Sequence, residues 1–158
     1  MEALLICKST HHGNTAKLAD AIAKELRATV VTPEEVDAAS LGGFDLVGFG
    51  SGIYFGRPHA ALRHLVAGLR AAPRRSFLFS TSGLPVFSTW WHRGVRRALQ
   101  QRGSEIVGEF GCRGWDTVGP LWLIGGINRR HPDERDLQHA REFARSLAAR
   151  VRSAADET

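Results

Sequence analysis

The polar segment from Lys8 to Lys17, KSTHHGNTAK, combines residue types that can bind an anion between an apolar run and a helical pattern. Backbone N–H groups at a helix N-terminus lack intrahelical partners, and the helix dipole favours negative charge there. Gly13 would let the backbone approach a ligand closely. Further hydrogen bonds could come from Ser9, Thr10, Asn14 and Thr15. The segment therefore predicts a phosphate-binding loop. The alternative is a simple turn in which Asn14 or Thr15 caps the helix.

The spacing of this segment differs from that of other motifs. It has no Gly-Lys-Ser/Thr ending, which argues against an ATP or GTP loop, and no three-glycine dinucleotide fingerprint. His11 and His12 have no acidic or cysteine companion at ligand spacing, so we expect no metal site. Ser51 and Ser82 lack the flanking glycines of a nucleophile elbow, and we expect no catalytic residue there.

The elements that position this loop alternate along the chain. Short apolar or β-branched runs predict strands at 3–7, 29–32, 46–50, 76–80 and 106–110. Helical spacing predicts helices after the loop, from Pro58, over 89–102 and from Pro132. Alternation of this kind indicates an α/β fold with a five-stranded parallel sheet and helices on both faces. The spacing suits the doubly wound order 2-1-3-4-5, which the pattern alone does not fix. We expect a single domain over 1–152 and a frayed tail over 153–158.

Ligands of such a sheet bind beyond the carboxyl ends of the strands, near the point where the strand order reverses. The loop after the first strand lies there, and the third and fourth strands are followed by Ser51–Gly56 and Thr81–Gly83. Glycines in these loops would let peptide groups approach a planar ligand, and Tyr54 and Phe55 offer aromatic faces.

Three segments together resemble the flavodoxin family over essentially the whole chain. Thr10–Thr15 is similar to its phosphate loop, usually Ser/Thr-x-Thr-Gly-x-Thr. Asp45–Tyr54 resembles the third strand and first flavin loop, and Phe79–Gly83 occupies the place of the second flavin loop.

The resemblance implies flavin mononucleotide (FMN) as the cofactor. Its phosphate would lie on Ser9–Thr15 and its isoalloxazine ring between Ser51–Gly56 and Thr81–Leu84, with Tyr54 favoured over Phe55 as the ring neighbour. The implied cofactor-binding residues are Ser9, Thr10, His11, His12, Gly13, Asn14, Thr15, Ser51, Gly52, Ile53, Tyr54, Phe55, Thr81, Ser82, Gly83 and Leu84.

The chain departs from the family pattern at two positions. His12 stands where the phosphate loop usually has Thr, and a protonated imidazole would bind phosphate more strongly as the pH falls. The second flavin loop lacks the Tyr that often stacks there, and Trp90, Trp91 or Trp115 could substitute.

The formal net charge of +5 contrasts with electron-carrier flavodoxins, which are typically acidic. It suggests a redox partner with an acidic docking surface, and a positive field should raise the potential of the flavin. The arginines are scattered without a nucleic-acid motif, and no apolar run approaches the roughly 20 residues of a membrane helix. We therefore expect no nucleic-acid partner, no membrane insertion and a cytoplasmic monomer or homodimer, with Cys7 and Cys112 as free buried thiols.

Three functions follow from these features. The first is an FMN-binding redox protein that carries electrons. The alternative is an FMN-dependent oxidoreductase, because Ser51–Leu62 also resembles flavodoxin-fold, quinone-linked protoporphyrinogen oxidases. Against an enzyme, the chain lacks an obvious long insertion for a large hydrophobic substrate. The only segment that could cover a substrate pocket is Cys112–His131, with Trp115 and Trp122. A degenerate module without flavin is the third, and the intact Gly13, Asn14 and Thr15 argue against it.

Overall fold

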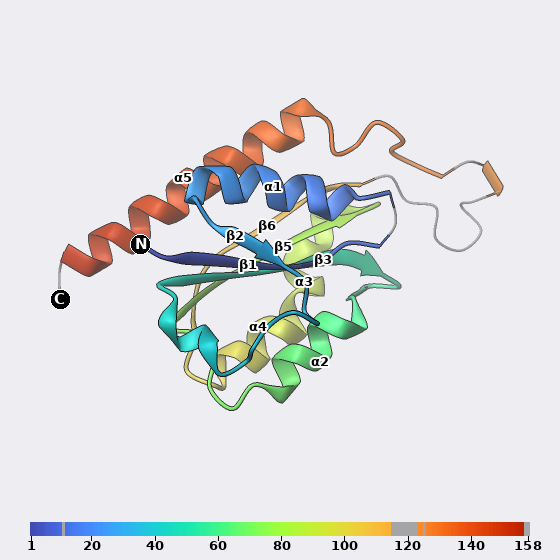
Figure 1. Cartoon of the computed structure of the whole chain (residues 1–158). Coiled ribbons are helices and arrows are strands. Elements are labelled where there is room, and N and C mark those ends of the chain that lie inside the picture. Colours follow the sequence, from blue (N-terminus) through green and yellow to red (C-terminus); the bar gives the residue numbers. More distant parts are fainter. Residues whose placement is uncertain (11, 115–122, 125, 157–158) are drawn as a thin grey trace.

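The computed structural model describes residues 1–10, 12–114, 123–124 and 126–156 (Figure 1). Within these residues, six strands form one sheet: β1 (Ala3–Lys8), β2 (Thr29–Val31), β3 (Leu46–Tyr54), β4 (Arg57–Pro58), β5 (Arg75–Ser82) and β6 (Glu105–Arg113). Five of them are parallel in the order β2-β1-β3-β5-β6, which confirms the predicted order 2-1-3-4-5. The sixth strand, β4, was not predicted and pairs antiparallel with the end of β3.

Helices cover both faces of the sheet (Figure 1). On one face lie α1 (Asn14–Leu26) and α5 (Glu134–Asp156). On the other lie α2 (Ala60–Gly68), α3 (Ser88–Trp91) and α4 (Arg93–Gln100). Short 3-10 turns occur at η1 (Ser40–Gly43) and η2 (Pro85–Phe87).

Each face of the sheet has its own apolar core. Alternate residues of β1 serve the two cores, with Leu5 facing α1 and α5 while Leu4 and Ile6 join the other cluster. One face of α1 is apolar and buried, with Leu18, Ala19, Ile22 and Leu26 on it, and Val95 of α4 is buried on the other side of the sheet. A continuous apolar strand is therefore what a sheet covered on both faces requires.

Two glycines of β3 leave room for aromatic rings of the neighbouring strand β5 to lie over β3. A Cβ added at Gly48 would lie 2.4 Å from the Phe77 ring, and one at Gly50 would lie 2.1 Å from the Phe79 ring. These residues are also register partners between β3 and β5. The glycines in the third strand are thus fixed by packing as well as by any role near a ligand.

The boundaries differ from the sequence prediction in three places. The predicted loop Ser51–Gly56 is largely strand, because β3 continues to Tyr54 and only Phe55 and Gly56 form the turn to β4. Pro58 lies in β4 rather than opening a helix, and α2 begins at Ala60 with His59 as its cap. The predicted helix over 89–102 is divided at His92 into α3 and α4.

The remaining expectations concern the C-terminal tail, membrane insertion and the two thiols. α5 extends to Asp156, so residues 153–156, expected in a frayed tail, are helical. None of the described helices is long and apolar enough to cross a bilayer. Cys7 and Cys112 are free and buried, as predicted.

Candidate functional site

The carboxyl ends of β1, β3 and β5 bring three predicted loops to one edge of the sheet. The Thr15 and Thr81 hydroxyl oxygens lie 2.8 Å apart, joining the start of α1 to the end of β5. The Thr10 hydroxyl and the Tyr54 hydroxyl are also hydrogen-bonded, at 2.5 Å. The first loop is therefore connected by side chains to both of the others, as parallel strands with a common carboxyl edge allow.

The first loop ends in a helix whose N-terminus is open. His12 and Gly13 both have left-handed backbone angles, with φ of 56° and 64°, and Gly13 is the N-cap of α1. No side chain of the described residues caps this helix, and its first turn has no acidic residue. Asn14 and Thr15 are buried within the helix itself, so the alternative that one of them is the N-cap is wrong. Because the first N–H groups of a helix lack intrahelical partners, this helix start can bind an anion.

Two buried hydroxyl groups at this edge have no hydrogen-bond partner among the described residues. They are the Oγ atoms of Ser9, after β1, and Ser82, at the end of β5. Leaving a buried polar group unsatisfied costs about 1–3 kcal/mol, so such groups usually have a partner in the functional state. A polar ligand between the first and third loops would supply it.

The hairpin between β3 and β4 presents two aromatic residues differently. The Tyr54 ring meets the His59 ring edge-on with centroids 5.7 Å apart, whereas Phe55 is 87% exposed at the turn. A Cβ added at Gly52 would lie 2.6 Å from the Tyr54 hydroxyl, so the glycine leaves the space that this hydroxyl occupies. Tyr54 is therefore held in place, and Phe55 projects from the surface.

The other residues of the hairpin make contacts that hold β3, β4 and the start of α2 together. Ser51 is buried, where its hydroxyl donates to the Gly52 carbonyl at 2.8 Å and accepts from the His59 backbone N–H at 3.0 Å. Ile53 is half-buried and is the register partner of Pro58. The His59 ring accepts a hydrogen bond from the Ala61 N–H, so it caps α2. A cavity of about 620 Å³ lies beside the hairpin, lined by Thr10, Tyr54, Phe55, Arg57, Pro58, His59, Ala60 and Arg63.

The third loop is supported by residues that sequence reasoning did not identify. The Gly83 carbonyl accepts a hydrogen bond from the Asn128 side chain at 3.1 Å, and the Ser82 carbonyl accepts one from the Gly114 N–H at 3.0 Å. A Cβ at Gly114 would lie 3.0 Å from the Asn14 side chain. Thr81 is buried and Leu84 is largely exposed. The sequence signal for Gly114 was only a glycine after a strand, and Asn128 gave none.

A buried polar network lies behind this edge. His92 is 3% exposed, and its two ring nitrogens lie 2.8 Å from the Ser80 hydroxyl and 3.0 Å from the Glu109 carboxylate, which also pairs with Arg96. Burial would raise the pKa of Glu109, but hydrogen bonds from His92 and Arg96 outweigh it and hold that pKa below its ordinary value. The network anchors α4 to β5 and β6.

The two cysteine thiols are protonated and therefore unreactive near pH 7. Burial, with a smaller contribution from nearby carboxylates, raises the pKa of Cys7 and of Cys112 to about 12. Both are therefore neutral near pH 7, and the adjacent Arg113 does not activate Cys112.

Of the residues singled out in the sequence, His11, Trp115 and Trp122 lie outside the described residues. Trp90 is 65% exposed on α3, and Trp91 lies near the hairpin, where its indole nitrogen would be 3.6 Å from a Cβ at Gly56. The remaining members of the predicted set come from the three loops at the same edge of the sheet (Figure 1).

Comparison with known proteins agrees with this architecture. The chain is 42% identical over 147 residues to an uncharacterised protein of Methanocaldococcus jannaschii, covering 93% of this chain and 98% of that protein. The flavodoxin of Streptococcus pneumoniae TIGR4 superposes with a TM-score of 0.70 at 19% identity, covering 95% of this chain and 99% of that one. Oxidised flavodoxin 2 of Bacillus cereus superposes with a TM-score of 0.69 at 19% identity, again covering 95% of this chain and 99% of that one. The sequence model of the flavodoxin domain matches residues 5–115, well over half of the chain, and the chain belongs to the flavodoxin domain family.

Proposed function

We propose that this chain binds FMN at the carboxyl edge of its sheet and carries electrons to a protein partner. The family implies a flavin cofactor. The observation that supports a phosphate-bearing flavin is the N-terminus of α1, which no side chain of the described residues caps, together with the buried Ser9 hydroxyl, which has no partner among those residues. A bound flavin would supply reversible electron transfer, and the residues of the chain bind and orient it.

The first loop would hold the phosphate. The backbone N–H groups that begin α1 donate to it, together with the Ser9 hydroxyl and the side chains of the proposed set Thr10, His11, His12, Asn14 and Thr15. Thr15 also keeps the loop in register with β5 through Thr81. This arrangement binds a dianion without requiring a lysine or arginine at the phosphate.

The hairpin and the third loop would hold the ring. Tyr54 is oriented by Thr10 and His59, which makes it a better ring neighbour than the exposed Phe55. The Ser82 hydroxyl, unpartnered in the described part of the chain, would hydrogen-bond to the flavin from the other side, beside Gly83 and Leu84. Gly52 keeps the space that Tyr54 needs.

The phosphate assignment is tested by comparing FMN with riboflavin. Flavin fluorescence or calorimetric titration should show tighter binding of FMN, because riboflavin lacks the group that the first loop would hold. Equal affinity for both flavins would contradict the assignment.

The partner is proposed to be acidic where it docks, because the chain carries a formal net charge of +5. Electron transfer to such a partner should slow as salt rises, since screening at physiological ionic strength acts over about 8 Å. Rates that stay flat or rise with salt would exclude this docking mode.

We also propose a cytoplasmic location, because two free buried thiols fit a reducing compartment. We propose one domain over 1–152.

A second function deserves a test because of the cavity of about 620 Å³ beside Tyr54 and Phe55. Cavities of this size hold small substrates, and Ser51–Leu62, which forms part of its wall, resembles flavodoxin-fold protoporphyrinogen oxidases. The alternative is therefore an FMN-dependent oxidoreductase acting on a quinone or a porphyrinogen-type substrate.

A further inference from the structure

A second groove, of about 400 Å³, lies on the other side of the hairpin. It shares Arg57, Pro58 and Arg63 with the cavity beside Tyr54. Its remaining wall comes from Gly56, Trp90, Trp91, Arg93, Gly94, Val95 and Arg97. Four arginines and two tryptophans from β4, α2, α3 and α4 thus converge on one groove, and none of the described residues that line it is acidic.

The four arginines of the groove differ from four arginines elsewhere that pair with carboxylates. Those four are Arg75, Arg96, Arg141 and Arg145, whereas Arg102, Arg150 and Arg152 donate to backbone carbonyls. Of the groove arginines, Arg63 donates to the Pro58 carbonyl. In the part of the chain that the structure describes, none of the four is ion-paired with a carboxylate.

Helix α4 contributes two of the four groove arginines. Arg93 and Arg97 are four residues apart, on the same side of the helix, and like charges at this spacing destabilise a helix. Arg96 of the same helix faces Glu109 instead. Positive charge is therefore concentrated on the groove while a neighbouring arginine is neutralised, which favours binding of an anion.

We propose that this groove binds a nucleoside diphosphate moiety, with the phosphates on the arginines and the base against the exposed tryptophan. Guanidinium groups bind phosphate oxygens in a bidentate manner, and a purine can stack on an indole. The groove has the volume of a small-molecule site. Several cations around one such volume match adjacent phosphates better than carboxylates spaced along an extended peptide.

Two sources could carry this moiety: a free nucleotide, or a nicotinamide dinucleotide extending past Arg57 into the neighbouring cavity. The assignment does not require bound FMN, because Gly56 is the only groove residue that belongs to the three loops proposed for the flavin, and the four arginines and two tryptophans lie outside those loops. Failure of one proposal therefore leaves the other intact.

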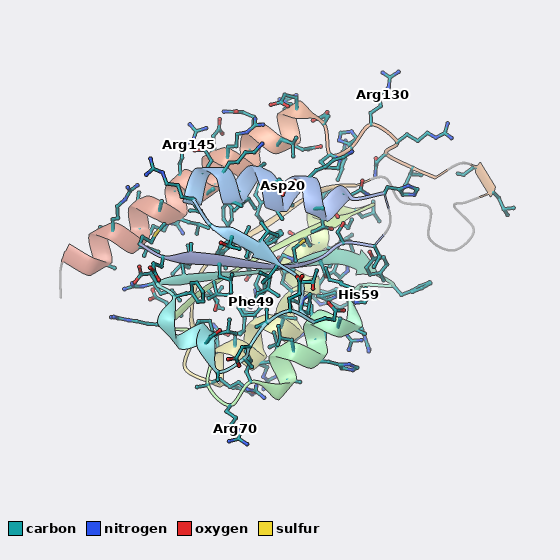
Figure 2. The ribbon with its side chains drawn as sticks, viewed as in Figure 1. Asp20, Phe49, His59, Arg70, Arg130 and Arg145 are labelled. Carbon is teal, nitrogen blue, oxygen red and sulfur yellow. The ribbon has the colours of Figure 1, made fainter. Side chains whose placement is uncertain are left out.

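The test is calorimetric titration of the whole chain, with and without saturating FMN, using ADP, NADH, pyrophosphate and benzene-1,2,4,5-tetracarboxylate. We expect ADP to bind, and Arg93→Ala/Arg97→Ala to weaken it about ten-fold or more. Arg57→Gln, outside α4, should weaken it as well. Arg70→Ala is the matched control, because Arg70 lies away from the hairpin (Figure 2) and outside the groove. Circular dichroism should show that every variant is folded.

The base contact is tested by Trp90→Ala, which should weaken ADP but leave pyrophosphate unchanged. Tighter binding of NADH than of ADP identifies the dinucleotide as the source, and the reverse identifies the free nucleotide. Absence of ADP and NADH binding at millimolar concentration would overturn the proposal. So would tighter binding of the tetracarboxylate, or equal loss in the Arg70→Ala control.

Discussion

The hydroxyl of Thr15, in the first turn of α1, is hydrogen-bonded to the hydroxyl of Thr81, near the end of β5, at 2.8 Å. This contact spans 66 positions of the chain and is buried. It fixes the first and third loops relative to each other, so a change at Thr15 should affect a ligand that lies on the first loop.

Thr15→Val should weaken FMN about ten- to hundred-fold, because a hydrogen bond to a charged group is worth about 1.5–3 kcal/mol. Riboflavin, which has no phosphate, should lose much less. Thr15→Ser retains the hydroxyl and should bind FMN nearly as the wild type does. Fluorescence titration of both flavins measures this, and unchanged FMN affinity in Thr15→Val would limit Thr15 to its contact with Thr81.

Gly52→Ala should reduce flavin binding without unfolding the protein. The added Cβ would lie 2.6 Å from the Tyr54 hydroxyl, which is the far end of a flexible side chain and can move at low cost. The displaced ring would then lose its hydrogen bond to Thr10 and its place beside the flavin.

The matched control for this change is Gly68→Ala. Gly68 lies in α2, where an added Cβ would meet nothing within 4 Å, and alanine favours helix. FMN affinity should fall in Gly52→Ala only, while melting temperatures of both variants stay near that of the wild type. Normal FMN affinity in Gly52→Ala would remove Tyr54 from the proposed site.

Periodicity predicted the parallel strands and the covering helices because each strand and helix must bury its own apolar side. It does not fix the order of the strands, which was predicted from the doubly wound arrangement that their spacing suits. It missed β4, since two residues carry no pattern and Pro58 equally suits a first helical turn. It also missed Asn128, whose side chain reaches Gly83 across 45 positions. Such contacts depend on how distant segments meet, and the local sequence does not encode them.

Glu109 should make stability depend on pH in the acid range. Its pKa in the folded protein lies below the ordinary value of 4.5, so the unfolded state binds its proton first. The ionised carboxylate therefore contributes its full stabilisation above about pH 4.5, the ordinary pKa. That contribution is lost as the pH falls through the lower pKa of Glu109 in the folded protein.

Glu109→Gln should consequently cost about 1–3 kcal/mol near neutral pH, because His92 and Arg96 lose their partner, and should flatten the acid dependence. Glu142→Gln, on the exposed side of α5, controls for removal of one charge. Urea unfolding between pH 3 and 7 measures both. An acid dependence equal to that of the wild type would mean that Glu109 does not stabilise the fold by its charge.

The thiols of Cys7 and Cys112 should resist modification in the folded protein. Both are buried, with a pKa of about 12, so neither reaches the reactive thiolate form at pH 8. A chromogenic disulfide reagent should react slowly with the native chain and rapidly with both thiols in denaturant. Fast reaction of one thiol in the native protein would reveal an opening of the core around it.

The last prediction separates an electron carrier from an enzyme, and it depends on what lies beside the hairpin. A substrate site needs a concave surface with apolar walls, and the cavity of about 620 Å³ next to Tyr54 offers one, with Phe55 at its edge. If the chain is a carrier, the FMN-loaded protein, once reduced, should pass electrons to a protein acceptor, and a soluble quinone should give no saturable turnover. Phe55→Ala should then change nothing measured with the quinone. Saturable turnover that falls sharply in Phe55→Ala or Trp115→Ala, with FMN still bound, would instead establish the oxidoreductase.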